Sequence, residues 1–227
     1  MNRPYTSNLD NFSRSEFHNS ESGSTIYFEA GIFYCGACQI RFSQNKYGML
    51  IVSSRQSPLL DHRIIGAYCN LISLKSIHTQ YIIKWRNDPN IAKWFNSAAS
   101  FDQVSHERWL ADAQASRRDF NFVIERVENC PAGMVALYNI DWEGRSAEFG
   151  RLLIGDPAAR RAGLAREAAV LLLGAAAKAG IEQVHLEVKE DNTAAITLYS
   201  SLGFRHLVPS ARRSGLIEMS LRIGNES

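Results

Sequence analysis

The segment that decides the fold is Arg160-Arg161-Ala162-Gly163-Leu164-Ala165, which follows a predicted strand and opens a long predicted helix. Its glycine and its last alanine are small, so the backbone can approach a bound group closely. The N–H groups of a first helical turn have no partner within the helix, and the helix dipole adds positive potential there. Arg160, Arg161 and Arg166 add full positive charge. We therefore expect this turn to bind a phosphate or pyrophosphate; the alternative is an ordinary helix start with solvated arginines.

A second pattern runs through Leu186-Glu187-Val188-Lys189-Glu190-Asp191-Asn192, then Ala194-Ala195-Ile196-Thr197-Leu198-Tyr199, then Leu202-Gly203-Phe204. It predicts a strand followed by a helix, because Asn192 is a suitable residue to begin a helix and Gly203 to end it. The two segments together resemble the GNAT acyltransferases, which bind acetyl-coenzyme A (acetyl-CoA) through a (Gln/Arg)-x-x-Gly-x-(Gly/Ala) motif. The resemblance covers about residues 70–222.

This resemblance implies the GNAT fold, an α/β (α+β) architecture in which a mixed central sheet carries helices on both faces. Apolar periodicity and turn residues predict the order β-α-α-β-β-β-α-β-α-β-β from residue 68 onward. The expected strands cover residues 69–74, 120–125, 133–141, 147–155, 184–189, 204–207 and 216–221. The expected helices cover residues 77–86, 102–115, 163–179 and 192–202.

The first 70 residues differ in composition from the rest of the chain. They contain 10 serines, 3 alanines and 10 of the 23 aromatic residues, whereas residues 71–227 contain 22 alanines. We predict a small N-terminal extension over residues 1–69, a GNAT domain over residues 70–222 and a tail over residues 223–227. Residues 1–24 are rich in Ser and Asn and are expected to be disordered.

Within the extension, residues 25–34, 39–43 and 49–53 are expected to form short strands, with a hairpin turn at Asn45-Lys46-Tyr47-Gly48. The predicted chemistry does not need this extension. It is interpreted either as a small accessory β-unit or as an over-extended reading frame in which Met49 is the true start.

Composition and charge argue against several other classes of protein. The chain has 227 residues, of which 45% are hydrophobic and 21% are charged, enough for a sizeable core. A net charge of +2, from 25 cations and 23 anions, argues against a large nucleic-acid footprint. No apolar run is long enough to span a membrane, and the polar first residues are no signal peptide. We therefore expect a cytoplasmic protein without nucleic-acid or membrane partners.

Four cysteines do not make a disulfide scaffold, so reduced thiols are expected. Cys35 and Cys38 have CxxC spacing, but the nearby candidate zinc ligands Cys69, His18 and His62 are irregularly spaced. A redox pair would also be followed by a helix, and a strand is expected there instead. We expect two incidental cysteines and no metal site.

Acetyl transfer from a thioester to an amine requires a base for the amine and a proton donor for the leaving thiolate. By resemblance, Glu187 is the expected base, directly or through water, and Tyr199 is the expected acid at the coenzyme A sulfur. Glu148, on the preceding strand, is an alternative base or a substrate contact. The other interpretations are a solvated strand carboxylate for Glu187 and a core aromatic residue for Tyr199.

The resemblance also assigns the contacts with the co-substrate acetyl-CoA. The backbone of Leu153 and Ile154 is expected to pair with the pantetheine arm as an added strand would. Asn192 is an expected coenzyme A contact, and its role as a helix cap would also explain the residue. The residues expected to hold the pyrophosphate are Arg160, Arg161, Ala162, Gly163, Leu164 and Ala165. Arg161-Ala162 stands where a Gly-Lys pair is common in the family, which removes one flexible position.

The segment Trp85-Arg86-Asn87-Asp88-Pro89-Asn90-Ile91-Ala92-Lys93-Trp94-Phe95, followed by His106, resembles a group that includes the PseH-type enzymes. Those enzymes acetylate the 4-amino group of a UDP-linked 4-amino-4,6-dideoxy sugar. Arg86 is expected to bind a phosphate or carboxylate, Phe95 to stack on a uracil or on the sugar methyl group, and His106 to bond a nucleotide hydroxyl or phosphate. With Glu148, these residues form the predicted substrate site.

Two other functions stay open. RimJ/RimL-type relatives acetylate the N-terminal amines of proteins. A non-catalytic acyl-CoA sensor would use the same fold, with the extension as its interaction module. The expected partner is a small-molecule amine, and the protein is expected to be a monomer or a homodimer.

Overall fold

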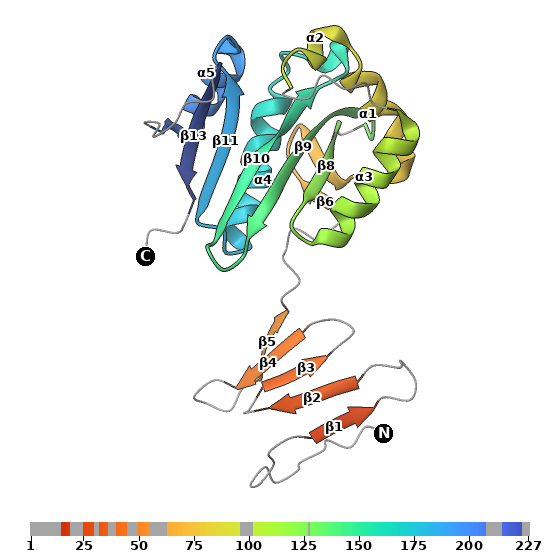
Figure 1. Ribbon diagram of the computed structural model, residues 1–227, viewed down its shortest axis with the longest axis vertical. Helices are drawn as coiled ribbons and strands as arrows, with labels where there is room; N and C mark the ends of the chain where they lie inside the picture. The colour runs from red at the N-terminus through yellow and green to blue at the C-terminus, as the bar shows by residue number, and fades with distance from the viewer. Residues whose placement is uncertain are drawn as a thin grey trace. The chain divides into compact units, whose positions relative to one another are not determined.

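The computed structural model describes residues 63–95, 102–126, 128–207 and 215–223, together with the backbone of five strands between residues 15 and 54. The chain divides into two compact units, residues 1–57 and 58–227 (Figure 1). The strand β6 (Arg63–Ile65) lies in the range predicted for the extension and pairs within the larger sheet. The predicted domain limits at residues 69 and 222 stay predictions.

The first unit is an antiparallel sheet in which each strand pairs with its neighbours in sequence. The strands are β1 (Ser15–His18), β2 (Thr25–Glu29), β3 (Ile32–Cys35), β4 (Ile40–Gln44) and β5 (Leu50–Ser54). The prediction of disorder over residues 1–24 is wrong at β1, because pairing with β2 gives its backbone polar groups partners. The pairing of β4 with β5 is that of the predicted hairpin, whereas its turn and Cys38 lie outside the described residues.

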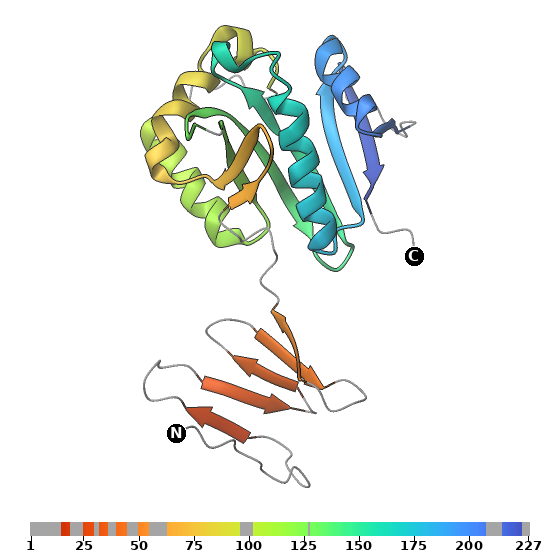
Figure 2. The same ribbon diagram turned by 180° about the vertical axis from the view of Figure 1, so that it is seen from behind.

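The second unit contains an eight-stranded sheet in the order β12-β13-β11-β10-β9-β8-β7-β6. All neighbouring strands are antiparallel except β10 and β11, which are parallel. The strands after β6 are β7 (Cys69–Ser73), β8 (Phe120–Arg126), β9 (Pro131–Asp141), β10 (Ser146–Ile154), β11 (Gln183–Lys189), β12 (Arg205–His206) and β13 (Leu216–Arg222). This mixed sheet with its helices (Figure 2) confirms the predicted fold class.

The helices of this unit are α1 (Thr79–Arg86), α2 (Pro89–Ala92), α3 (Gln103–Ser116), α4 (Leu164–Lys178) and α5 (Thr193–Ser201). Two of them begin as predicted, because the side chains of Asp102 and Asn192 accept backbone N–H groups of the first turn. Gly180 and Gly203 follow α4 and α5 with φ of 88° and 96°, a conformation that favours glycine.

The helix α2 is absent from the sequence prediction. The helix α1 ends at Arg86, as the predicted range does, but Asp88-Pro89 then starts a new helix. The Asp88 carboxylate accepts the N–H of Asn90 at 2.9 Å, and proline at the first helical position needs no N–H partner.

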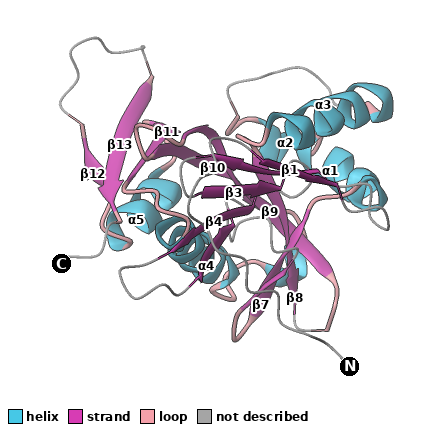
Figure 3. Cartoon of the chain, turned by 90° about the horizontal axis from the view of Figure 1, so that it is seen from below, coloured by secondary structure: helices cyan, strands magenta, loops and turns pink. Residues whose placement is uncertain are grey.

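The two faces of the larger sheet carry separate apolar cores, with α1, α2 and α3 on one side and α4 and α5 on the other (Figure 3). The buried residues on the α4 and α5 side include Leu137, Phe149, Leu172 and Leu186. Those on the α1 to α3 side include Ile82, Ile91, Leu110 and Met134. The sheet thus separates two environments, and the face on which a side chain lies decides which helices and which core surround it.

Glu167, in the first turn of α4, fixes the start of this helix to the turn between β6 and β7. Its carboxylate accepts the backbone N–H groups of Ala67 at 2.6 Å, Tyr68 at 2.9 Å and Cys69 at 2.8 Å. Glycine at position 66 makes this approach possible, since a Cβ there would lie 2.9 Å from the Glu167 carboxylate. The predicted phosphate-binding turn is therefore held against the sheet.

The strand β10 pairs with β11 only at its beginning. The register joins Ser146 to Gln183 and Glu148 to His185, and the described strands do not pair beyond this point. Further along, Gly150 pairs with Ala136 and Leu153 with Met134, so β10 has one extra residue there and forms a bulge against β9. The C-terminal ends of β10 and β11 are therefore not paired with each other within the described residues.

Candidate active site

A cavity of about 290 Å³ borders the C-terminal end of β10. It is formed by α2 and the residues after it, the end of β10, the segment before α4 and the residue before α5. The lining residues are Asn90, Ile91, Trp94, Phe95, Leu152, Leu153, Ile154, Arg160 and Asn192. Five of them, Phe95, Leu153, Ile154, Arg160 and Asn192, are residues that the sequence predicts for the site.

The end of β10 offers an unpaired backbone edge to a bound acyl-CoA arm. Leu153 and Ile154 pair with β9 on one side, and β11 no longer pairs with β10 after Glu148 within the described residues. A bound chain that carries amide groups can therefore hydrogen-bond to β10 as an added strand does. The Arg160 Nε donates to the Ile154 carbonyl at 3.4 Å, which fixes the segment before α4 beside this edge.

The turn before α4 has the geometry of an anion site. Gly163 adopts a φ of 78° and ends the loop. The first helical hydrogen bond runs from the Glu167 N–H to the Gly163 carbonyl, so the N–H groups of residues 164–166 have no acceptor within the helix. Together with the exposed Arg160 and Arg161, this arrangement fits the pyrophosphate of acetyl-CoA.

The other residues predicted for this turn lie around the cavity without lining it. Arg161, Ala162 and Gly163 are exposed, Ala165 is half-buried, and Leu164 packs in the core at 4% exposure. Arg161 adopts a φ of 64°, so this position, where the family commonly has glycine, takes a conformation that glycine adopts without strain.

The two predicted carboxylates lie on the same face of the sheet. Glu148 is paired with His185 of β11, and Glu187 is two residues further along β11, so their side chains leave the sheet on one side. Leu186 and Val188 point to the other side, where they are buried. This is the face that α1, α2 and α3 cover, and the Glu187 side chain is exposed on it.

Tyr199 belongs to the opposite face. It is 8% exposed on α5, in edge contact with the ring of Phe149 on β10, with ring centroids 6.0 Å apart. Burial, with a smaller effect of Tyr138, raises the pKa of the Tyr199 phenol to about 12. The phenol therefore stays protonated at neutral pH, as a proton donor must. The structure thus places the predicted base and acid on opposite faces, near the point where β10 leaves β11.

The predicted acceptor residues are only partly brought together. The Arg86 guanidinium lies 3.5 Å from the centre of the Phe95 ring, which lines the cavity. Burial, with the nearby charge of Arg151, lowers the pKa of Arg86 to about 10, and the group remains cationic at neutral pH. His106 is 1% exposed, packs against Trp109 with the two rings tilted, and does not line the cavity, so its predicted contact with a nucleotide stays a prediction.

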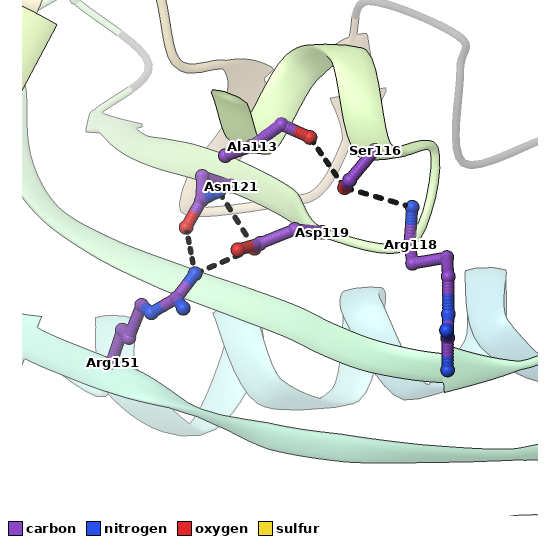
Figure 4. Close-up of polar contacts among 6 residues, drawn as sticks. All are labelled: Ala113, Ser116, Arg118, Asp119, Asn121 and Arg151. Atoms are coloured by element: carbon purple, nitrogen blue, oxygen red, sulfur yellow. Dashed lines mark hydrogen bonds and ion pairs between the residues drawn. The ribbon is translucent and has the colours of Figure 1, made fainter. Parts of the chain in front are cut away.

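Sequence reasoning missed a cluster beside these residues. Arg151, at the bulge of β10, donates from Nη1 to the carboxylate of Asp119 at 2.5 Å and to the amide oxygen of Asn121 at 2.7 Å (Figure 4). Its guanidinium lies 4.1 Å from the centre of the Tyr138 ring and 5.1 Å from that of Trp109. The available signal was Gly150 inside a predicted strand, which is typical of a bulge.

A sequence model of the acetyltransferase (GNAT) domain matches residues 71–205, more than half of the chain. The chain therefore belongs to the GNAT acetyltransferases and is an acetyl-CoA-dependent N-acetyltransferase. No curated protein was found that matches the sequence. This family assignment contradicts the hypothesis of a non-catalytic acyl-CoA sensor.

Solved structures of similar fold agree with this family. A probable GNAT acetyltransferase from Chromobacterium violaceum is 20% identical with a TM-score of 0.61, over 72% of this chain and 87% of that one. The spermidine N-acetyltransferase from Vibrio cholerae in complex with CoA and spermine is 23% identical with a TM-score of 0.61, over 69% and 96%. A GCN5-related N-acetyltransferase from Brucella melitensis is 21% identical with a TM-score of 0.58, over 71% and 78%.

The described residues contain no group of three or more His, Cys, Asp or Glu side chains that could hold a metal ion. None of the helices in the described part of the chain is long and apolar enough to cross a membrane.

Proposed function

We propose that this enzyme acetylates a primary amine of a small polar acceptor, in the first place the 4-amino group of a nucleotide-linked 4-amino-4,6-dideoxy sugar. The observation that supports it is one cavity that combines Leu153, Ile154, Arg160 and Asn192 with the aromatic side chain of Phe95. The Arg86 guanidinium on the Phe95 ring adds a cation beside a stacking surface. A nucleoside diphosphate needs this combination, a stacking surface for its base and a cation for its phosphates.

The reaction divides between the two faces of the sheet. Acetyl-CoA supplies an acetyl group activated as a thioester. Glu187 takes a proton from the acceptor ammonium, directly or through water, and frees the nitrogen lone pair. As the C–N bond forms and the C–S bond breaks, Tyr199 donates its proton to the sulfur. The nitrogen then loses a second proton, which restores Tyr199, and Glu187 releases its proton to solvent.

One observation favours a second acceptor class. Glu218 of β13 is the register partner of Glu187, so three carboxylates, with Glu148, lie on one face of neighbouring strands. Such a surface attracts a cationic acceptor. The similar structure from Vibrio cholerae is a spermidine N-acetyltransferase solved with spermine. A polyamine is therefore the second candidate.

An acceptor screen monitored by release of free thiol tests the proposal. The panel contains UDP- and dTDP-linked 4-amino-4,6-dideoxy sugars, spermidine and spermine, and peptides with free N-termini for the RimJ/RimL-type alternative. The matched controls are the same nucleotide sugars with a 4-hydroxyl group. Turnover of the amino sugars alone supports the first candidate, and thiol release with polyamines or peptides alone rejects it.

A variant of Arg86 separates the two small-molecule classes. Arg86→Gln is expected to raise the KM for a nucleotide sugar by about 10- to 100-fold, the size of one lost hydrogen bond to a charged group. The same variant leaves the KM for a polyamine unchanged or lowers it, because a cation is removed. An unchanged KM for the nucleotide sugar would remove Arg86 from the acceptor site.

A further inference from the structure

We propose that Tyr138 is a further catalytic residue, whose hydroxyl group contacts the attacking amine of the acceptor, and that Arg151 is a positioning residue that holds its ring. This inference rests on the proposed acetylation of an amine, and it does not depend on which class of amine is accepted.

The strand register places Tyr138 in the row of the two carboxylates. Tyr138 on β9 is the partner of Glu148 on β10, and Glu148 is the partner of His185 on β11. Partners in neighbouring strands project from the same face of a sheet. Tyr138 therefore leaves the sheet on the face that carries Glu148 and Glu187.

The ring of Tyr138 leans along β10 toward the cavity. A Cβ added at Gly150 would lie 2.9 Å from the Tyr138 hydroxyl oxygen and 3.2 Å from its ring, so the phenol covers this glycine. Gly150 is two residues beyond Glu148, just as Glu187 is two residues beyond the Glu148 partner His185. The hydroxyl thus reaches the level of Glu187, where β10 and β11 have separated.

Arg151 holds the ring in this position. Its guanidinium lies over the ring at 4.1 Å, while Asp119, just before β8, and Asn121, within β8, accept from its Nη1 (Figure 4). Arg151 has a φ of 52°, a backbone conformation rare outside glycine. The bulge therefore directs the Arg151 side chain across β9. Held by its two acceptors, Arg151 fixes one orientation of the Tyr138 ring before an acceptor binds.

The chemistry of a primary amine matches this arrangement. An ammonium group has three N–H donors, and the Tyr138 oxygen with the carboxylates of Glu148 and Glu187 provides acceptors for them. Burial, together with the charge of Glu148, raises the pKa of Tyr138 to about 12, so the hydroxyl stays neutral at working pH. A neutral phenol accepts one N–H while it donates its own O–H to a carboxylate, and the nitrogen is held as Glu187 takes its proton.

The first experiment compares Tyr138→Phe with the wild type on an amine that the wild type acetylates. Phenylalanine keeps the ring under Arg151 and over Gly150 and removes only the hydroxyl. We expect kcat/KM for the acceptor to fall by about 10- to 100-fold, with the Kd for CoA changed less than about twofold. Tyr68→Phe is the matched control, because Tyr68 is 69% exposed and lies in the turn between β6 and β7.

Three further variants test the position of the Tyr138 hydroxyl and the role of Arg151 in holding the ring. Gly150→Ala keeps the hydroxyl but displaces it, and is expected to raise the acceptor KM without changing the KM for acetyl-CoA. Arg151→Met is expected to raise the acceptor KM, and Arg151→Lys, which keeps a cation on the ring, to restore part of it. A purely structural role for Arg151 would lower the melting temperature of both Arg151 variants and leave their acceptor KM unchanged.

The outcomes separate this inference from the proposed function. Wild-type kinetics in Tyr138→Phe, or an equal loss of CoA binding, overturns the role of Tyr138 while amine acetylation stands. Turnover of polyamines or peptides alone rejects the nucleotide-sugar class of acceptor, and Tyr138→Phe is then compared with the wild type on the amine that is accepted. If the wild type acetylates no amine at all, the proposed function fails and the role of Tyr138 fails with it.

Discussion

Two tyrosines stand near the point where β10 leaves β11, one on each face of the sheet, and burial raises the pKa of both to about 12. Tyr199 is enclosed by the rings of Phe149 and Phe204 on the α4 and α5 side. Tyr138 lies on the other side, in register with Glu148 and under Arg151. Similar pKa values therefore arise in an apolar environment and in a polar one.

This difference shows how the two faces of one sheet can serve two proton transfers, one to the leaving thiolate and one from the acceptor ammonium group. A largely apolar surrounding keeps Tyr199 neutral, which suits a donor to a thiolate. A row of carboxylates beside Tyr138 suits the binding and deprotonation of an ammonium group. The predictions below test whether the two faces divide the chemistry in this way.

The largest effect is expected at Tyr199. Tyr199→Phe keeps the packing against Phe149 and removes the proton donor, so kcat is expected to fall by about 10²- to 10⁴-fold, with little change in CoA binding. Steady-state kinetics and calorimetric titration with CoA measure the two quantities. Tyr81→Phe, at a residue that is 44% exposed on α1, is the control. An unchanged rate would remove Tyr199 from the mechanism.

A smaller effect distinguishes the two carboxylates of the other face. Glu187→Gln is expected to lower kcat/KM by about 100-fold and to abolish the acidic limb of its pH profile, as the loss of a general base does. Glu148→Gln is expected to cost about tenfold, mainly in the acceptor KM, and to keep that limb. The reverse pattern would make Glu148 the base.

Arg161, in the turn before α4 that is expected to bind acetyl-CoA, allows a test of backbone strain against the stability of the fold. Arg161→Gly relieves the left-handed conformation at this position and is expected to stabilise the fold by about 1 kcal/mol, measured by urea unfolding. Arg161→Ala keeps the strain and is expected to leave the stability unchanged. Both variants lose the same charge, so their KM for acetyl-CoA should rise equally. A rise in Arg161→Ala alone would show that backbone shape, not charge, is what the site needs.

The smallest effect concerns His106 on the acceptor side. Burial lowers the pKa of His106 below its ordinary value of 6.5, so the unfolded chain binds a proton there that the folded chain does not. The free energy of unfolding is therefore not reduced by His106 above about pH 6.5. It falls as the pH drops from there toward the lower pKa that His106 has in the folded chain.

Replacement of His106 by leucine is expected to reduce this loss of melting temperature between pH 7.5 and about pH 5.5. The exposed His206 provides the control variant, His206→Leu. Part of the loss should remain in His106→Leu, because the pKa of His78 is lowered by burial as well. Equal pH dependence in wild type and His106→Leu would contradict the prediction.

Much of the fold could be predicted because its signals are local. Asn192 and Gly203 act within one helical turn, and their predicted roles at the start and the end of a helix are confirmed. The strand β1 and the strand β6 were missed for the opposite reason. They are short segments whose backbone is satisfied by pairing with a neighbour, and their own residues carry little periodicity.

The candidate site shows the same division. The resemblance to the GNAT acyltransferases predicted Leu153, Ile154, Arg160 and Asn192, and the structure brings them to one cavity. It could not predict Tyr138 and Arg151, because their contact depends on a bulge that shifts the register of β10 against β9. It also could not predict that His106 is buried, since a histidine on a helix has no local signal that tells which face packs.

The sequence by itself determined the family and the order of most elements, because the motifs and the helix and turn signals that carry them are formed by side chains close together in the chain. Only the tertiary structure decided which face each residue serves. That choice depends on strand register, on the separation of β10 from β11 after Glu148 and on the helices that cover each side. These are long-range relations, in which a shift of one residue moves a side chain to the opposite face of the sheet.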